Sequence, residues 1–354
     1  MTPLIPTTEA WRPAASSHAP GPRACPFLPG EGTSPGFLPP PGRASSMSAV
    51  RPARHILTID LEEHFHASRF DSPMRRRYWS YCDSRIHKNA EHLLEILAHH
   101  STKATFFTLG WLAERYPSLI QTIAASGHEI ACLGYTHKPV SAQTPAQFRA
   151  DIRRAKLLLE DVIGQPVLGF RAPGFSITAD TVWALAIVAD CGFSYDSSVL
   201  PVGFSSNRLA VENRLQHLQA GPRSILEISP STMHMSGFRV PIGGGGYLRT
   251  LSYPVLRTLF SQIESLGEPI VLYLRAWELN YKQPRMEGPM LAEFIRYKNI
   301  HKVESRLTQI LTDFSFGSVR DMNQPARAPV GRRDSSHDSV SAGYTDQSLS
   351  TAMQ

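Results

Sequence analysis

Two acidic residues that could divide catalytic work lie where a short apolar run ends. Asp60 and Glu62 follow the β-branched segment 55–60, which reads HILTID. Because side chains of an extended chain alternate between faces, residues two apart project to the same side. Carboxylates paired at a strand end can serve as a general base and a metal ligand. On spacing alone, two solvated acids in a loop are the ordinary alternative.

Other polar side chains follow runs that also predict strands. An arginine in such a position can hold a carboxylate through two parallel hydrogen bonds. A histidine can ligate a metal, although a lone loop histidine is more often a surface residue or one satisfied by its neighbours. These candidates are His137, Arg171, Asp196, Arg275 and Trp277.

The elements that would position these residues alternate between strand and helix patterns. Strands are predicted at 55–60, 104–108, 128–133, 168–171, 193–196 and 270–274. Repeated β-then-α units favour a parallel sheet closed, or nearly closed, into a barrel. In such barrels the functional site lies at the C-terminal ends of the strands, where the candidates fall.

The clearest helix is predicted over 144–163, where apolar residues recur at three- and four-residue spacing. Thr144 is its expected N-cap, with Pro145 at the first helical position, Gln147 completing a capping box and Gly164 ending the helix. Further helices are predicted at 179–190, 248–266, 290–297 and 303–313, the last two as a C-terminal pair. The run of four glycines at 243–246 lacks a following Lys-Ser/Thr, so a turn with positive φ is its ordinary explanation.

Composition narrows the class of protein. The chain has 354 residues, 42% of them apolar, and a formal net charge of +6. Its basic residues are scattered, with the densest run at 75–77, so nucleic-acid binding is not expected. The four cysteines lie far apart without a CxxC pair, which fits a reducing compartment. No run approaches the ~18–20 apolar residues of a membrane span, and no secretory h-region is evident, so we expect a cytoplasmic protein without a transmembrane segment.

Both ends of the chain differ in composition from its centre. Residues 1–50 hold 11 of the 28 prolines, and we expect this segment to be disordered, with Met47 as a hypothetical true start of translation. The segment 323–354, rich in Ser, Asp, Arg and Gly, is expected to be disordered as well. One domain over 51–322 is therefore predicted.

The ordered set of motifs is more specific than any one of them. The segments TIDLEEHFH, ATFFTLGWLAERYP, GHEIACLGYTHKPV, GFRAPGFSIT, YDSS, PIGGGGY and LYLRAWE occur in that order. Together they resemble the polysaccharide deacetylases of carbohydrate esterase family 4, the NodB-homology domain, and more narrowly the branch associated with exosortase and exopolysaccharide loci. The resemblance covers nearly everything from His55 to Met322.

The resemblance implies a fold, an activity and a set of roles. The implied fold is a distorted (β/α) barrel of about seven parallel strands with a C-terminal helical extension. The implied activity is metal-dependent removal of N-acetyl groups from polysaccharide or oligosaccharide sugars, commonly with zinc. By motif match, Asp60 is the general base, Arg171 pairs with it, Glu62 and His137 are metal ligands, the backbone N–H near Gly174 helps hold the oxyanion, and Asp196 and Trp277 line the substrate groove.

Two positions depart from the family pattern. Leu133 stands where the first histidine of the metal-ligand pair is expected, and Arg275 where the catalytic histidine is expected. Catalytic zinc usually takes three protein ligands plus water, and leucine offers none. Arginine stays protonated and is a poor general acid, although it can stabilise an oxyanion or hold an acidic sugar.

Two hypotheses follow. In the first, the chain is a divergent deacetylase in which Asp60 deprotonates a metal-bound water and Arg171 orients Asp60. In the second, the same scaffold binds a glycan or a partner without hydrolysis.

Overall fold

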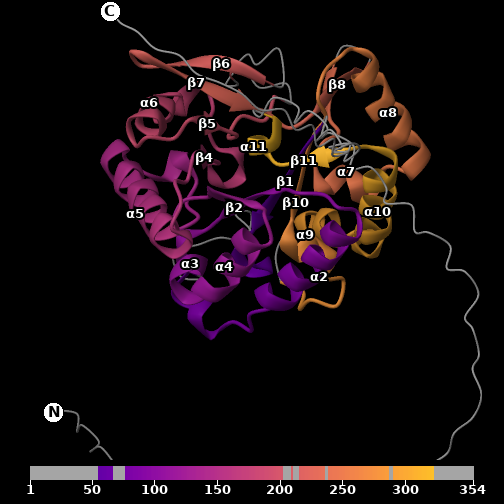
Figure 1. The fold of residues 1–354 in the computed structure, drawn as a ribbon, viewed down its shortest axis with the longest axis horizontal. Helices are drawn as coiled ribbons and strands as arrows, with labels where there is room; N and C mark the ends of the chain where they lie inside the picture. The colour runs from indigo at the N-terminus through magenta and orange to yellow at the C-terminus, as the bar shows by residue number, and fades with distance from the viewer. Residues whose placement is uncertain are drawn as a thin grey trace, which may run out of the picture. The chain divides into compact units, whose positions relative to one another are not determined.

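The computed structural model describes residues 55–66, 76–201, 209, 215–235, 238–286 and 290–322. Their main sheet is ordered β10-β1-β2-β3-β4-β5-β7-β6, and β11 pairs with β1 beside this path (Figure 1). The strands are β1 (His55–Leu61), β2 (Thr105–Thr108), β3 (Glu129–Cys132), β4 (Gly169–Phe170), β5 (Tyr195–Asp196), β6 (Leu215–Ala220), β7 (Arg223–Ile228), β10 (Val271–Arg275) and β11 (Phe316–Gly317). A separate hairpin joins β8 (Thr232–Met235) to β9 (Phe238–Pro241).

Every pairing from β10 through β1–β5 to β7 is parallel, and only β6 runs antiparallel to its neighbour. Seven consecutive strands are thus parallel, which confirms the predicted curled, parallel sheet of the (β/α) type. Within the described residues, the path ends at β10 on one side and at β6 on the other. The carboxyl ends of β1, β3, β4, β5 and β10 therefore meet at one rim of the sheet.

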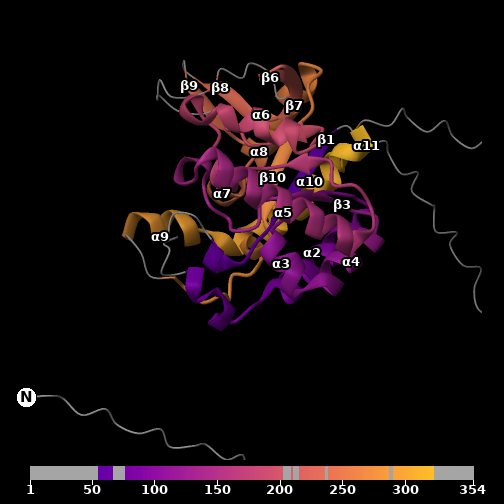
Figure 2. The same ribbon diagram turned by 90° about the vertical axis from the view of Figure 1, so that its left-hand side faces the viewer.

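Helices surround the sheet in Figure 1. They are α2 (Ile86–His99), α3 (Gly110–Arg115), α4 (Pro117–Ala125), α5 (Pro145–Ile163), α6 (Trp183–Asp190), α7 (Gly245–Thr250), α8 (Tyr253–Ser265), α9 (Met290–Tyr297), α10 (Val303–Asp313) and α11 (Val319–Met322). The predicted C-terminal helical extension is present as α9 and α10. Helix α10 contacts α7, and Figure 2 shows α9 at the outer end of this group.

The predicted boundaries of α5 are confirmed. Thr144 and Gln147 form the capping box, and Gly164 ends the helix in the left-handed conformation with φ of 64°. The apolar stripe that includes Phe148 and Ile152 faces the core. Local capping chemistry therefore determines where this helix begins and ends.

Three expectations were wrong. The segment 248–266 is two helices, because Leu251 is extended and α8 begins anew with Pro254 in its first turn. The segment 179–190 begins as a 3₁₀ turn (Ala179–Thr181) before α6. The glycines at 243–246 do not need positive φ; at three of them a side chain would collide with neighbours.

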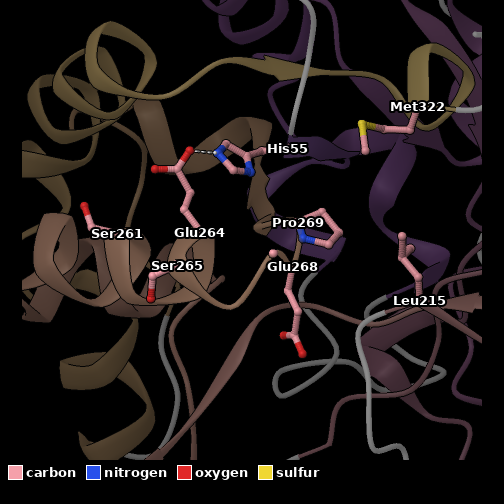
Figure 3. Close-up of a pocket in the computed structure, with 9 residues that line it drawn as sticks. His55, Leu215, Ser261, Glu264, Ser265, Glu268, Pro269 and Met322 are labelled. Carbon is pink, nitrogen blue, oxygen red and sulfur yellow. Dashed lines mark hydrogen bonds and ion pairs between the residues drawn. The ribbon is translucent and has the colours of Figure 1, made fainter. Parts of the chain in front are cut away.

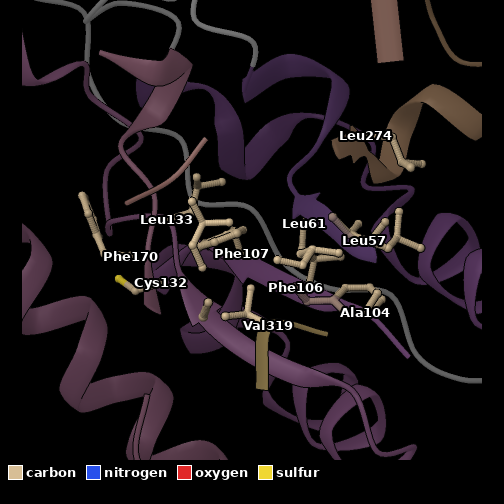
Figure 4. Close-up of a cluster of buried hydrophobic side chains, with 14 of the residues drawn as sticks. Leu57, Leu61, Ala104, Phe106, Phe107, Cys132, Leu133, Phe170, Leu274 and Val319 are labelled. Atoms are coloured by element: carbon tan, nitrogen blue, oxygen red, sulfur yellow. The ribbon is translucent and has the colours of Figure 1, made fainter. Parts of the chain in front are cut away.

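The core fills the space between the sheet and the helices. Figure 4 shows part of it, where Leu133 lies among Phe107, Cys132 and Phe170. Leu133 is only 2% exposed, so the residue that replaces the expected histidine is a packed core residue. Burying a leucine side chain of this kind stabilises the fold by about 1.5–3 kcal/mol.

Some expectations fall outside the described residues. The Pro-rich segment 1–50 with Met47, and the tail 323–354, belong to this group. Among the helices that are described, none combines the length and the apolar character that a membrane crossing requires.

Candidate functional site

The first pair at the rim joins Asp60, at the end of β1, to Arg171, directly after β4. Arg171 Nη1 lies 2.7 Å from Asp60 Oδ1, and both side chains are buried. Burial raises the pKa of Asp60, while the positive charge of Arg171 works against this rise. The pairing expected for Asp60 and Arg171 is therefore present in the fold.

Arg171 is held on all sides by groups that orient it. Its Nε donates to the Ser197 carbonyl at 3.1 Å, and its Nη2 donates to Thr58 Oγ1 at 3.0 Å and Ser197 Oγ at 2.7 Å. The guanidinium also lies 4.0 Å from the ring centroid of Phe107. An arginine with this many fixed contacts presents Asp60 in one orientation, because moving either side chain would break several buried hydrogen bonds.

The second pair joins Glu62, after β1, to His137, after β3. His137 Nε2 lies 2.8 Å from Glu62 Oε2. The other oxygen, Oε1, receives Arg275 Nε at 2.9 Å and Trp277 Nε1 at 3.1 Å. Burial opposes the charge of Glu62, but the contacts with His137, Arg275 and Trp277 outweigh it and hold the pKa of Glu62 at about 2.

A carboxylate on α5 shapes the loop that presents His137. Asp151 accepts hydrogen bonds from the backbone N–H of Tyr135 at 2.8 Å and of Thr136 at 3.1 Å. The loop turns at Gly134 with φ of 77°, and His137 itself has φ of 53°, an uncommon conformation for a side-chain-bearing residue. Asp151 was not predicted from the sequence, where its one signal is an acid beside the apolar stripe of α5.

Arg275 ends β10, directly beside Asp60 in the parallel register of β1 and β10. Its backbone N–H donates to Glu278 Oε2 at 3.0 Å, and Glu278 Oε1 receives Arg249 Nη1 at 2.5 Å. A Cβ on Gly245 would lie 1.9 Å from Glu278 Oε2, so a glycine is needed there to admit that carboxylate. Neither Glu278 nor Arg249 was predicted from the sequence as part of the site.

The residues present do not fit the three-ligand zinc site of the family. Glu62 and His137 converge as predicted, but both oxygens of Glu62 already receive donors and Leu133 supplies no lone pair. Cys132 is no substitute, because burial raises the pKa of its thiol to about 12. Across the described ranges, no group of three or more His, Cys, Asp or Glu side chains is arranged to hold a metal ion.

His66 is excluded as a ligand by its hydrogen bond. Its Nδ1 lies 3.2 Å from the backbone N of Glu63 and must accept that proton. A neutral imidazole that accepts at Nδ1 carries its hydrogen on Nε2, so Nε2 has no lone pair for a metal.

Of the remaining predicted residues, Trp277 and Gly174 lie beside the cluster of Asp60, Glu62, His137 and Arg171, and Asp196 lies apart from it. Trp277 contacts Glu62 directly, and its own side chain is buried. Gly174 lies in an exposed turn with φ of 67°, and the next residue, Phe175, has its ring 5.2 Å from the Arg171 guanidinium.

Asp196 does not line an accessible groove. It is fully buried and accepts hydrogen bonds from Ser198 N and Oγ. It is also the register partner of buried Glu227, and burial together with the Asp196 charge raises the pKa of Glu227 well above its ordinary value. The groove role of Asp196 was implied by the motif match, and a sequence motif does not report how deeply a side chain lies below the rim.

A hollow of about 780 Å³ lies elsewhere, at the opposite end of the strands. Figure 3 shows His55, the first residue of β1, bonded to Glu264 there at 3.0 Å. Asp60 lies five residues further along the extended chain than His55, a distance of roughly 16 Å. This hollow is therefore distinct from the Asp60–Glu62 cluster.

Chemically, the cluster can bind a polar group, orient it and accept a proton at Asp60. Arg275 has a side chain that is 25% exposed, against 7% or less for Asp60, Glu62 and His137, so it forms the outward part of the cluster. A buried carboxyl group with raised pKa is suited to general-base work. A fixed guanidinium is suited to a developing oxyanion.

The sequence of this chain is similar to those of known proteins. Residues 72–195 match the profile of the polysaccharide deacetylases, and residues 197–324 match a domain of unknown function, DUF3473. A peptidoglycan deacetylase-like protein from Gibberella zeae is 34% identical over 97 residues, which is 27% of this chain and 28% of that protein. A peptidoglycan-N-acetylglucosamine deacetylase from Bacillus cereus is 32% identical over 81 residues, 23% of this chain and 30% of that protein. A chitooligosaccharide deacetylase from a Bradyrhizobium species is 32% identical over 73 residues, 21% of this chain and 33% of that protein.

The chain thus spans about a third of the length of these curated relatives. Among solved structures, a family 4 carbohydrate esterase from Streptomyces lividans shares 16% identity at a TM-score of 0.40, covering 77% of this chain and 95% of that one. A CE4 family pseudoenzyme from Bacillus anthracis shares 13% at a TM-score of 0.41, covering 77% and 66%. At this level, structural likeness carries no argument about activity.

Proposed function

Because this chain belongs to the polysaccharide deacetylase family, we propose that it acts on N-acetylated polysaccharides or oligosaccharides, with removal of N-acetyl groups as its class of reaction. The observation that carries the proposal is the convergence of Asp60, Glu62, His137 and Arg171 at one rim of the sheet. The names of the peptidoglycan and chitooligosaccharide deacetylases that match this chain support the substrate class.

In this proposal each residue has a role that its contacts allow. Asp60 accepts the proton of an attacking water, and Arg171 keeps the carboxylate oriented through the 2.7 Å bond. Arg275 stabilises the negative charge that develops on the carbonyl oxygen, since it stays protonated and cannot supply a proton to the leaving amine. The leaving amine must then take its proton from protonated Asp60 or from solvent.

The family is generally metal-dependent, and a bound divalent metal would polarise both the water and the carbonyl. We propose that this chain does not hold zinc in the family's manner, because Glu62 and His137 are engaged and position 133 is apolar. Loss of metal chemistry lowers the hydrolytic rate that the remaining residues can support.

One contact favours a second candidate function, binding of the glycan without hydrolysis. Arg275 Nε contacts Glu62 Oε1 at 2.9 Å. Because arginine stays protonated, position 275 no longer supplies the general acid that the expected histidine would provide. General acid–base catalysis contributes about 10²–10⁴ in rate, so the loss of the acid together with the metal separates binding from turnover.

Acetate release from an N-acetylated chito-oligosaccharide distinguishes the two candidates. The proteins to compare are wild type, Asp60→Asn and the double variant Leu133→His/Arg275→His, with Leu157→His, on the exposed face of α5, as the control. Hydrolysis by the wild type that Asp60→Asn abolishes supports the enzyme. Binding without acetate release, with release appearing only in the double variant alongside stoichiometric zinc, supports the binding protein. If no N-acetylated glycan binds or reacts with any of the proteins, the proposed substrate class is wrong.

We also propose that the protein works in the cytoplasm during exopolysaccharide synthesis. The support is chemical: Cys82, Cys132 and Cys191, the cysteines in the described part, are all free, which fits a reducing compartment. Fractionation of cells that express the full chain tests this, and recovery from the periplasm or medium would contradict it.

A further inference from the structure

We propose that the Arg275 guanidinium is the resident cation of this site and that, together with Asp60, it binds the acetamido group of the substrate directly and without metal. The inference rests on the proposed function and specifies how the N-acetyl group is recognised. It begins from the disagreement between the residues present and a zinc site.

Glu62 is a buried carboxylate whose charge must be compensated. A buried carboxylate is costly unless a positive charge or several donors compensate it. Arg275 Nε at 2.9 Å, Trp277 Nε1 at 3.1 Å and His137 Nε2 at 2.8 Å together satisfy both oxygens of Glu62. The carboxylate is therefore compensated by protein groups alone.

Arg275 is held in place through its backbone and through one nitrogen of its side chain. Its main chain is fixed by pairing with β1 and by the hydrogen bond from its N–H to Glu278. Glu278 is fully buried and is itself held by Arg249 and enclosed by Gly245. Arg275 is thus anchored at its backbone and at Nε, which leaves only the outer end of the guanidinium to meet a ligand.

Arg275 has hydrogen-bond donors besides the one that contacts Glu62. A guanidinium has five N–H groups, and here Nε–H serves Glu62. The contact of Nη1 with Glu278 Oε1 is 4.0 Å, too long for a hydrogen bond. These outer N–H groups belong to a side chain that is 25% exposed, in a cluster whose other members are buried.

Asp60 supplies a hydrogen-bond acceptor beside Arg275. Asp60 uses Oδ1 for Arg171 and keeps Oδ2 outside that bond. Asp60 and Arg275 are register partners on neighbouring strands, so their Cα atoms lie about 4.8 Å apart. The rim therefore offers a fixed cationic donor beside a carboxylate acceptor.

This pairing matches a secondary amide. An acetamido group presents a carbonyl oxygen for the Arg275 N–H groups and an N–H for Asp60. A free amino sugar lacks the carbonyl oxygen that the Arg275 N–H groups require, and an O-acetyl ester lacks the N–H that Asp60 requires. The site should therefore prefer N-acetylated sugars to deacetylated or O-acetylated ones.

Calorimetric titration tests the inference with the full chain. Penta-N-acetylchitopentaose and its fully deacetylated counterpart are titrated in EDTA and again with added zinc, into wild type, Arg275→Met and the control Arg149→Met on the surface of α5. We expect wild type to bind the acetylated sugar equally well in EDTA and in zinc, and to bind the deacetylated sugar at least tenfold more weakly. Arg275→Met should bind the acetylated sugar about tenfold or more weakly than wild type does, since a hydrogen bond to a charged group contributes about 1.5–3 kcal/mol. Arg149→Met should bind as wild type does.

Arg275→Lys keeps the inference testable if Arg275→Met does not fold. Lysine retains the charge but lacks the planar fork that reaches Glu62 and a ligand from separate nitrogens, and we expect a several-fold loss of affinity. Binding that disappears in EDTA, or that is unchanged in a folded Arg275 variant, overturns the inference while the proposed substrate class stands. Absence of binding to any acetylated glycan overturns both.

Discussion

Replacing Glu62 by Gln tests the energetics of the cluster most directly. Folding lowers the pKa of Glu62 from 4.5 to about 2, because contacts with His137, Arg275 and Trp277 outweigh the effect of burial. One pKa unit corresponds to 1.36 kcal/mol, so ionised Glu62 contributes about 3 kcal/mol to the free energy of unfolding at neutral pH. Glu62→Gln removes that charge and leaves Arg275 and His137 facing a neutral amide.

The sign of the pH dependence follows from the direction of the shift. A carboxyl group whose folded pKa is lowered stabilises the protein above its unfolded pKa. The contribution of Glu62 is therefore complete above about pH 4.5 and is lost as the pH falls towards 2. The difference in free energy of unfolding between wild type and Glu62→Gln should be constant from pH 8 to 6 and shrink below pH 4.5.

Urea denaturation of EDTA-treated protein, followed by tryptophan fluorescence at several pH values, measures this difference. The matched control is Glu114→Gln, which removes an exposed carboxylate 3.0 Å from Arg154. Exposed pairs contribute about 0–1 kcal/mol. If Glu62→Gln costs no more than Glu114→Gln at pH 7, the buried ion-pair account of the cluster is wrong.

Three further changes give distinct outcomes. Gly245→Ala should destabilise the protein by about 1–3 kcal/mol in chemical denaturation, because its Cβ would meet the Glu278 carboxylate at 1.9 Å; Gly246→Ala, with nothing nearer than 3.7 Å, is the control, and equal effects of the two would contradict the steric argument. Glu227→Gln should reduce the loss of stability as the pH rises above 4.5, the ordinary pKa of a glutamate, because burial and Asp196 raise the pKa of folded Glu227, and a group with a raised pKa loses its stabilising effect as pH rises; parallel plots of the free energy of unfolding against pH for wild type and variant would refute this. Thr144→Ala should lower the free energy of unfolding by about 1 kcal/mol through loss of the capping box, and an unchanged denaturation midpoint would count against a contribution from the cap.

Local signals predicted the elements whose stability is decided within a few residues. The capping box of Thr144 and the left-handed Gly164 bound α5 as expected, because both act on adjacent backbone groups. The alternation of strand and helix patterns predicted the parallel sheet, since short crossovers between such units leave few other topologies. The break between α7 and α8 was missed although the sequence carries its local signals, Ser252 at the N-cap and Pro254 in the first turn of α8.

The amino-acid sequence by itself determined the family, the strand ends that carry polar residues, and the two departures at Leu133 and Arg275. Only the tertiary structure decided what those departures do. Arg275 and Glu62 are more than 200 residues apart in the chain, and their 2.9 Å contact depends on β10 lying beside β1. In the same way, the depth of Asp196 and the anchoring of Glu278 follow from packing around the rim. A sequence specifies which charges are present, whereas the energy of each charge depends on the distances and burial that folding creates.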